Sequence, residues 1–221
     1  MTDIGPERPT VRRTVFSTPR SGEFVELRAL QAQTGQPAEM FGDVVLKELL
    51  DNALDGAETA DRAPVIEISI RTDDYREITL VTMTDNGAGI TSDIVTRLCD
   101  FDQLVSDKAR YRGPTRGAQG NAFKTVLGIP FALGVAEPVV IESAGVRHEL
   151  RVTVDPVGDV VVVHDETASE RTVGTSVTVP LPSHLEVDLW WWALGAALVN
   201  PHAAISVIEH ASEQGSIRRR R

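Results

Sequence analysis

The longest helical pattern of the sequence runs from Ala38 to about Ala60, and the two faces of this helix differ in chemistry. A helix with a wide apolar stripe must bury that stripe against another layer of structure. The stripe consists of Val45, Leu46, Leu49, Leu50, Ala53 and Leu54. The feature therefore requires a layered fold in which one face of this helix is buried and the other stays accessible.

Strand patterns supply the second layer. Residues 65–71 alternate between isoleucine and mostly polar side chains, as a half-buried strand does. Further strands are predicted at residues 77–84, 138–143, 147–154, 159–164, 172–180 and 203–208. Further helices are predicted at residues 23–33, 91–99, 119–128 and 185–198. Because helices and strands do not alternate strictly, the pattern favours an α+β two-layer sandwich over a doubly wound parallel sheet.

Composition sets the domain organisation. The chain has 221 residues and 42% hydrophobic residues, which suits one domain with a core at residues 23–210. Residues 1–22 are rich in Pro, Arg, Thr and Ser and are interpreted as an extended arm. Residues 211–221 form a basic tail that is predicted to be disordered.

Other bulk properties exclude several classes of protein. No apolar run approaches the roughly 20 residues of a membrane helix, and no apolar stretch follows the N-terminal charges as in a secretory signal. A single cysteine, Cys99, excludes an intrachain disulfide framework. These features indicate a cytoplasmic location without membrane contact. The net charge of −10 argues against broad, nonspecific DNA binding.

The accessible face of the long helix carries Glu48, Asn52 and Asp55 at positions i, i+4 and i+7. A solvated polar face is the simpler interpretation of three such residues. However, asparagine lowers helix propensity in mid-helix. Glu, Asn and Asp together also supply a base and oxygen ligands for a hard cation such as Mg²⁺.

A second motif, Asp85-Asn-Gly87-Ala-Gly89, directly follows a predicted strand. A hairpin turn is one interpretation, but a helical pattern comes next instead of a strand. A carboxylate at a strand end can accept a hydrogen bond from an exocyclic amine, and glycines let backbone approach a flat ring.

A third motif, Gly117-x-x-Gly120, precedes a predicted helix. Backbone amides at a glycine-rich helix start bind anions, and Lys124 lies about one turn into the helix. A flexible linker is the alternative. The polar, basic residues 100–118 are predicted to form a mobile loop that closes over a triphosphate. Together the three motifs indicate a pocket for a purine nucleotide and its metal.

These motifs, with Gly174-Thr175 as a fourth, resemble in kind and order those of the GHKL ATPases, which include gyrase B subunits, heat-shock chaperones and histidine kinases. The resemblance implies a Bergerat-type fold, in which helices cover one face of a mixed, mostly antiparallel sheet. Within the superfamily, the stretches 47–57, 115–120 and 200–203 are most similar to the B subunits of topoisomerase VI. The likeness covers about residues 22–208. Position 122 departs from it, with Ala where many members have Gly, and no transducer domain is expected in this chain.

By this resemblance, Glu48 would be the general base of ATP hydrolysis, Asn52 would ligate Mg²⁺, and Asp85 would bind the adenine amine. The other implied nucleotide-binding residues are Asp55, Gly87, Gly89, Ile90, Gly117, Gln119, Gly120, Asn121, Lys124 and Thr175. The implied partners are ATP, a second copy of the chain in an ATP-dependent homodimer, and DNA or a chaperone-like protein partner acting through a missing or separate subunit.

Two other functions remain open at this point. One is a nucleotide-gated binding or dimerisation module with little turnover, and the other is a GHKL protein kinase. Outside the motifs, His148, His164, His184 and His210 are scattered along the sequence and predict no metal site. The Trp190–Trp192 run is predicted to pack a helix against the sheet.

Overall fold

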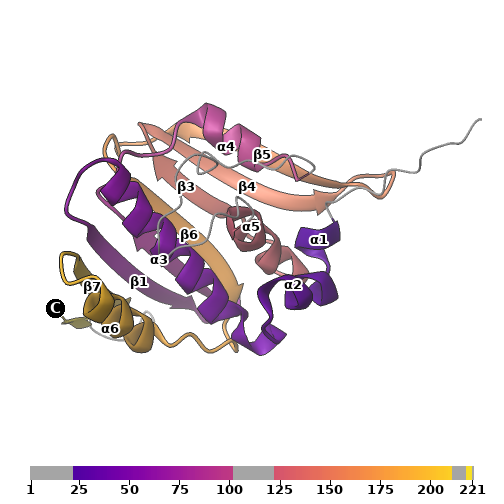
Figure 1. Ribbon diagram of the computed structural model, residues 1–221. Coiled ribbons are helices and arrows are strands. Elements are labelled where there is room, and N and C mark those ends of the chain that lie inside the picture. Colours follow the sequence, from indigo (N-terminus) through magenta and orange to yellow (C-terminus); the bar gives the residue numbers. More distant parts are fainter. Residues whose placement is uncertain (1–21, 102–121, 211–217, 221) are drawn as a thin grey trace, which may run out of the picture.

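The computed structural model describes residues 22–101, 122–210 and 218–220. Their strands form one sheet in the order β5-β4-β3-β6-β2-β1-β7-β8 (Figure 1). Strands β1 and β7 are parallel, and the other neighbouring pairs are antiparallel. The strands are β1 (Val65–Asp73), β2 (Ile78–Thr84), β3 (Val139–Ser143), β4 (Val146–Val154), β5 (Val160–Ala168), β6 (Thr175–Pro182), β7 (Ala204–His210) and β8 (Arg218–Arg220).

The helices gather on one face of this sheet, which we call the helix-covered face (Figure 1). They are α1 (Gly22–Val25), α2 (Leu27–Thr34), the 3₁₀ turn η1 (Ala38–Met40), α3 (Phe41–Thr59), α4 (Ser92–Leu98), α5 (Ala122–Ala132) and α6 (Leu189–Val199). The structure therefore confirms the predicted α+β sandwich with a mixed, mostly antiparallel sheet. Within the described residues, none of these helices is long and apolar enough to cross a membrane.

The core lies between α3, α5 and the sheet. Ile68 pairs with Met83, Met83 with Val177, and Val177 with Ile141, so that one buried apolar row crosses four strands. The stripe of α3 packs on this layer, as its periodicity predicts. Burying such a row and its covering helix is the main apolar contribution to the stability of the fold.

The opposite face of the sheet is polar near its centre. The hydroxyl groups of Thr82 and Thr178 are 2.9 Å apart, and those of Thr84 and Ser176 are 3.0 Å apart. These side chains alternate with the buried apolar row, so this face is polar where β2 ends and β6 begins, and it is apolar at the other end of the two strands, where Ile78, Leu80, Pro180 and Pro182 lie.

Several boundaries differ from the sequence prediction. The helix predicted at residues 23–33 is interrupted at Glu26, which has extended backbone angles between α1 and α2. Helix α6 begins at Leu189, four residues later than predicted, because the Asp188 side chain caps it by accepting a hydrogen bond from the Trp191 amide. Strand β5 continues through residues 165–168, since pairing with β4 compensates for the low strand propensity of Asp165, Glu166 and Ala168.

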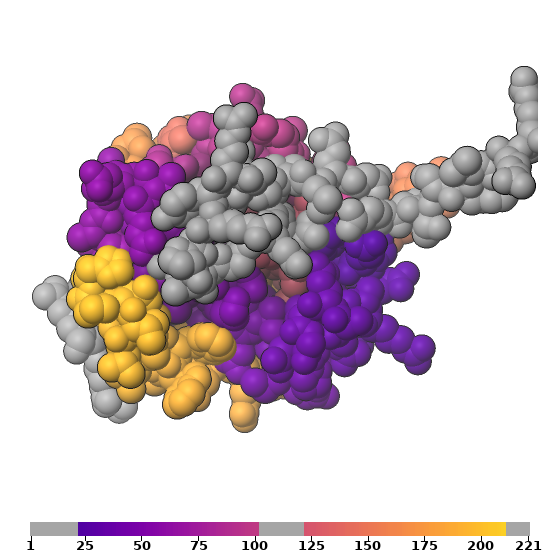
Figure 2. Space-filling view, in the orientation of Figure 1, coloured from indigo at the N-terminus to yellow at the C-terminus, as the bar shows by residue number. Residues whose placement is uncertain are grey.

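The tryptophan run lies where α6 meets its neighbours. Trp190 donates a hydrogen bond from Nε1 to Glu209 on β7, and Trp192 donates one to Asp43 on α3. In the space-filling view α6 (yellow) lies beside α3 (purple) (Figure 2). Trp191 points away from these contacts and is 71% exposed. Two of the three indoles therefore hold α6 in place, in keeping with the predicted packing role.

The predicted N-terminal arm lies outside the described residues, except for Gly22. Of the predicted basic tail the structure describes only Arg218–Arg220, which pair as strand β8 with β7, and the rest of the tail lies outside the described residues. These three residues pair with the open edge of β7 through backbone hydrogen bonds.

Candidate functional site

Helix α3 presents the first predicted group of residues on the side away from its buried stripe. Glu48, Asn52 and Asp55 are all half-buried. The Lys47 ammonium contacts Glu48 Oε1 at 3.1 Å and Asp51 Oδ2 at 3.0 Å, which restrains the Glu48 carboxylate. Among the described residues the side-chain amide of Asn52 has no hydrogen-bond partner, so its oxygen is accessible to a ligand.

Asp85 stands at the end of β2, next to the first residue of β6. Its backbone amide donates to the Thr175 carbonyl at 2.9 Å. Its side-chain Oδ1 accepts hydrogen bonds from the amides of Gly87 at 2.7 Å and Thr175 at 3.2 Å. Among the described residues, the other oxygen, Oδ2, has no protein partner. Asp85 therefore has one oxygen held by the fold and one oxygen free for a donor.

Burial raises the pKa of the Asp85 carboxyl. The hydrogen bonds from the Gly87 and Thr175 amides and the charge of Arg171 oppose this rise. A carboxylate that is partly removed from water gains more from a bound donor than an exposed one does.

The loop after Asp85 rests on the C-terminal turns of α3. A Cβ on Gly87 would lie 2.6 Å from the backbone carbon of Gly56, and the Ala88 amide donates to the Gly56 carbonyl at 3.4 Å. Arg62 holds the loop from the other side, because its Nη1 donates to the carbonyls of Asn86 and Gly87 at 2.8 and 3.0 Å. The contact between the loop and Gly56 brings the Asp85 motif and the polar face of α3 into one site.

Asn86, in the middle of the second motif, has a structural role. Its Oδ1 accepts a hydrogen bond from the Val65 amide at 2.9 Å, and its Nδ2 donates to the Ala63 carbonyl at 3.0 Å. It thereby fixes the start of β1 against the loop, and its amide is already engaged.

Gly174 and Gly89 are required by close backbone contacts within the protein. Gly174 has a φ of +69°, and a Cβ there would lie 2.0 Å from the Asp85 carbonyl oxygen. Gly89 has a φ of +85°, and a Cβ there would lie 2.9 Å from Ser143 Oγ. These glycines let β6 and the Asp85 loop approach each other, in addition to the predicted approach to a ring.

Ser143, at the end of β3, was missed by the sequence interpretation. Its buried hydroxyl donates to the Gly174 carbonyl at 3.0 Å and accepts from the Ile90 amide at 2.8 Å. It therefore connects Gly174-Thr175 to the end of the Asp85 loop. The available signal was a serine in the core-facing alternation after Val139 and Ile141.

The third motif falls only partly within the described residues. Gly117, Gln119, Gly120 and Asn121 lie outside them, as does most of the loop predicted at residues 100–118. Lys124 is fully buried, with its ammonium donating to the Asp100 carbonyl and lying 5.7 Å from the centre of the Phe24 ring. These contacts place the Lys124 side chain against α1 and the end of α4, and its role beside phosphates stays a prediction.

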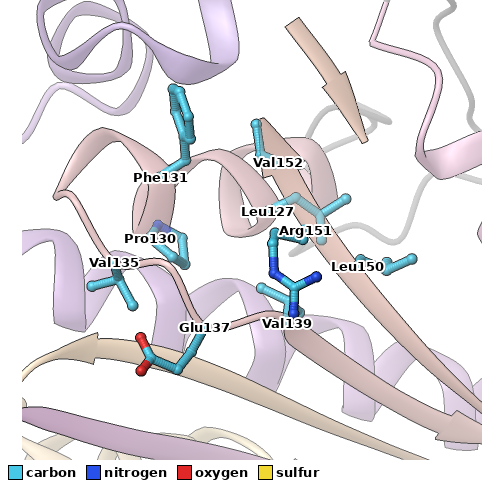
Figure 3. Close-up of a pocket in the computed structure, with 9 residues that line it drawn as sticks. All are labelled: Leu127, Pro130, Phe131, Val135, Glu137, Val139, Leu150, Arg151 and Val152. Carbon is cyan, nitrogen blue, oxygen red and sulfur yellow. The ribbon is translucent and has the colours of Figure 1, made fainter. Parts of the chain in front are cut away.

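A shallow hollow elsewhere on the surface lies between α5 and β4 (Figure 3). Most of the residues that line it are apolar, and Glu137 and Arg151 are the charged ones. It contains none of the predicted site residues. We therefore place the candidate site between α3, the Asp85 loop and Gly174-Thr175, and not in this hollow.

Comparison with known proteins shows which sequences this chain resembles. Residues 43–185 match the family described as histidine kinase-, DNA gyrase B-, and HSP90-like ATPase. The chain is 31% identical over 176 residues to the B subunit of type 2 DNA topoisomerase 6 from Natronomonas pharaonis, an alignment that covers 74% of this chain and 21% of that protein. The subunits of the same name from Halobacterium salinarum and Thermococcus onnurineus are 28% and 27% identical, with 78% and 75% of this chain and 23% and 30% of those proteins covered. The chain thus spans less than a third of the length of these relatives.

Proposed function

The chain belongs to the histidine kinase-, DNA gyrase B-, and HSP90-like ATPase family, and from this premise we propose that it binds ATP and hydrolyses it with Mg²⁺. The observation that carries the proposal is the Asp85 carboxylate. Its Oδ1 is held by two backbone amides, and its Oδ2 has no protein partner among the described residues. The exocyclic amine of adenine is a donor that suits this oxygen.

The triphosphate extends from this adenine end toward α3. The contact between Ala88 and Gly56 places the Asp85 loop beside the polar face that carries Asn52 and Asp55. By family resemblance we assign Asp55 and Thr175 to the adenine end of the site, where they would contact the base through water. By family resemblance we also assign Gly87, Gly89 and Ile90 to the ring, and Gly117, Gln119, Gly120, Asn121 and Lys124 to the phosphates.

The residues present fit a magnesium ion. Asn52 has an amide oxygen without a partner among the described residues, and Mg²⁺ prefers a few oxygen ligands together with substrate phosphates. Asn52 would therefore hold the metal. When bound, the metal would offset negative charge on the phosphates.

Glu48 is one turn of α3 before Asn52 and is the proposed general base. Its carboxylate accepts the proton of a water molecule as the water oxygen bonds to the γ-phosphorus and the bond to the leaving ADP oxygen breaks. The Lys47 ammonium, 3.1 Å from Glu48 Oε1, restrains this carboxylate. The side chain of Glu48 is 24% exposed, so water reaches it.

The coupled work is proposed from the relatives. Three of them carry the name of the B subunit of type 2 DNA topoisomerase 6. We infer that ATP binding makes this chain dimerise, and that the dimer acts on a DNA-linked partner subunit. Size measurement by light scattering, with and without a nonhydrolysable ATP analogue, tests the dimer. A chain that stays monomeric with saturating analogue would refute it.

Turnover of ATP by Glu48→Ala and Glu48→Gln tests the mechanism. Both variants should bind ATP with near wild-type affinity and release phosphate at least about 100-fold more slowly, since proton transfer by a positioned side chain contributes roughly that much. Glu58→Gln, on the same helix, is the control and should keep wild-type turnover. Equal rates in wild type and Glu48→Ala would exclude Glu48 as the base. ATP binding with no turnover by the wild type would leave a nucleotide-gated binding module.

A further inference from the structure

Three side chains of the β4–β5 hairpin converge at the edge of the sheet, away from α3. His148 Nδ1 lies 2.9 Å from His164 Nε2 and 3.3 Å from Glu166 Oε1. His164 Nε2 lies 3.4 Å from the same Glu166 oxygen. Two imidazole nitrogens and one carboxylate oxygen thus form a small triangle of lone-pair donors.

The register of β4 and β5 produces this cluster. Glu166 is directly opposite His148, and His164 is opposite Leu150. Strand residues two apart share a face, so all three side chains lie on the same side of the hairpin. Because His148 also pairs with Ile141 across β3 and β4, that side is the helix-covered face. The buried apolar row that crosses the sheet therefore continues at the edge into His148 and Glu166, whose side chains can both ligate metals.

The triangle has the dimensions of a metal site. Two donors that are each about 2.1 Å from one ion are separated by about 3.0 Å at a right angle and by about 3.4 Å at the tetrahedral angle. The three observed separations, 2.9, 3.3 and 3.4 Å, span this range. One ion can therefore reach all three atoms with little movement of the hairpin.

Hydrogen bonding alone satisfies the cluster poorly. In neutral form each imidazole carries one proton, so at most one hydrogen bond joins the two facing nitrogens. His148 is completely buried, and among the described residues its Nε2 has no hydrogen-bond partner.

We propose that His148, His164 and Glu166 bind one divalent transition metal ion of the zinc class. Two imidazoles and a carboxylate favour such an ion over Mg²⁺, which prefers oxygen ligands. His164 is 15% and Glu166 45% exposed at the side chain, so the ion retains at least one coordination position toward solvent. The site is independent of the proposed ATP site, whose metal is assigned to Asn52.

Calorimetric titration with Zn²⁺ tests the proposal on the full chain, without a histidine tag and with Mg²⁺ in excess. The wild type should bind one Zn²⁺ per chain. His164→Ala and Glu166→Gln should each weaken binding by at least about tenfold, since each removes one of three ligands. These two side chains reach the surface, so the variants should keep the wild-type circular dichroism spectrum.

The control variant is His202→Ala. His202 Nε2 lies 3.2 Å from Glu58 Oε1, and within the part of the chain that the structure describes this histidine–carboxylate pair does not belong to a group of three metal-ligating side chains. Its removal should leave Zn²⁺ affinity unchanged. Failure of the wild type to bind Zn²⁺ saturably, or equal affinity in His164→Ala and His202→Ala, would overturn the proposal.

A measurement on the wild type needs no variant. In a histidine-detected NMR titration, Zn²⁺ should shift the ring signals of His148 and His164 at one equivalent and leave those of His184, His202 and His210 unchanged. Shifts confined to the latter three would place zinc elsewhere and refute the site.

Discussion

Replacing Asp85 by asparagine tests the adenine end of the proposed site with almost no change in shape. The amides of Gly87 and Thr175 both donate to Asp85 Oδ1. In the variant, the side-chain oxygen must occupy this position to keep both bonds. The NH₂ group then takes the place of Oδ2 and points a donor toward the adenine amine, which is itself a donor.

The expected loss of ATP affinity follows from the two hydrogen-bond donors that face each other in the variant. A hydrogen bond to a charged group contributes about 1.5–3 kcal/mol, and each 1.4 kcal/mol changes an affinity tenfold. Affinity for ATP should therefore fall about 10- to 100-fold. The affinity for ITP, which has a carbonyl oxygen in place of the amine, should fall less or increase.

In contrast to the affinity for ATP, the thermal stability of Asp85→Asn should not decrease at neutral pH. Burial raises the pKa of Asp85, so the folded protein holds this proton more tightly than the unfolded chain does. The free energy of unfolding contributed by Asp85 therefore decreases as pH rises from the ordinary aspartate pKa through the raised one. Asp85→Asn has no such loss, and its Tm at neutral pH should equal or exceed that of the wild type.

Calorimetry with ATP and ITP, together with thermal melts of both proteins, separates these effects. Unchanged ATP affinity in Asp85→Asn would refute the adenine contact. Loss of affinity for both nucleotides with a large fall in Tm would instead indicate damage to the fold.

Two further predictions concern Gly174 and Cys99. Gly174→Ala should lower the free energy of unfolding by about 2–4 kcal/mol in urea titrations, because its Cβ would meet the Asp85 carbonyl oxygen at 2.0 Å. Gly145→Ala, with a φ of +81° and nothing within 4 Å of its Cβ, should lose only about 1 kcal/mol, and equal losses would contradict the clash. Burial raises the pKa of Cys99 to about 11, so its alkylation rate should be about 100-fold below that of an ordinary thiol at pH 8 and increase with pH up to about 11. A rate that levels off near pH 9 would disagree.

The long elements could be predicted because their periodicity is local. The stripe of α3 and the alternation in β1 and β2 are contained in the residues of each element. The break at Glu26 was missed because α1 is positioned by a distant contact. A Cβ on Gly128 of α5 would lie 1.6 Å from the Phe24 carbonyl oxygen, so α1 crosses α5 where the chain has no side chain.

The motif residues of the candidate site could be named from the sequence, but the residues that hold the motifs in place could not. Ser143 and Arg62 act on carbonyl groups distant in sequence, and no local pattern indicates such contacts. The sequence interpretation of the histidines considered only their spacing along the chain, which does not reveal that His148 and Glu166 pair across strands β4 and β5. Asp155 Oδ1 accepts three backbone hydrogen bonds in the β4–β5 turn, and counting outward from that turn places Glu166 opposite His148.

The position of β6 late in the sequence determines when the candidate site can form during protein synthesis. This late strand lies between β2 and β3, which leave the ribosome much earlier. Until residues 175–182 emerge, Asp85 lacks the Thr175 amide and Ser143 lacks the Gly174 carbonyl. The two halves of the sheet, β1–β2 and β3–β5, must come together around the same strand. Nascent chains that end before β6 should therefore be unable to retain ATP, because the same late strand joins the two halves of the sheet and completes the candidate site.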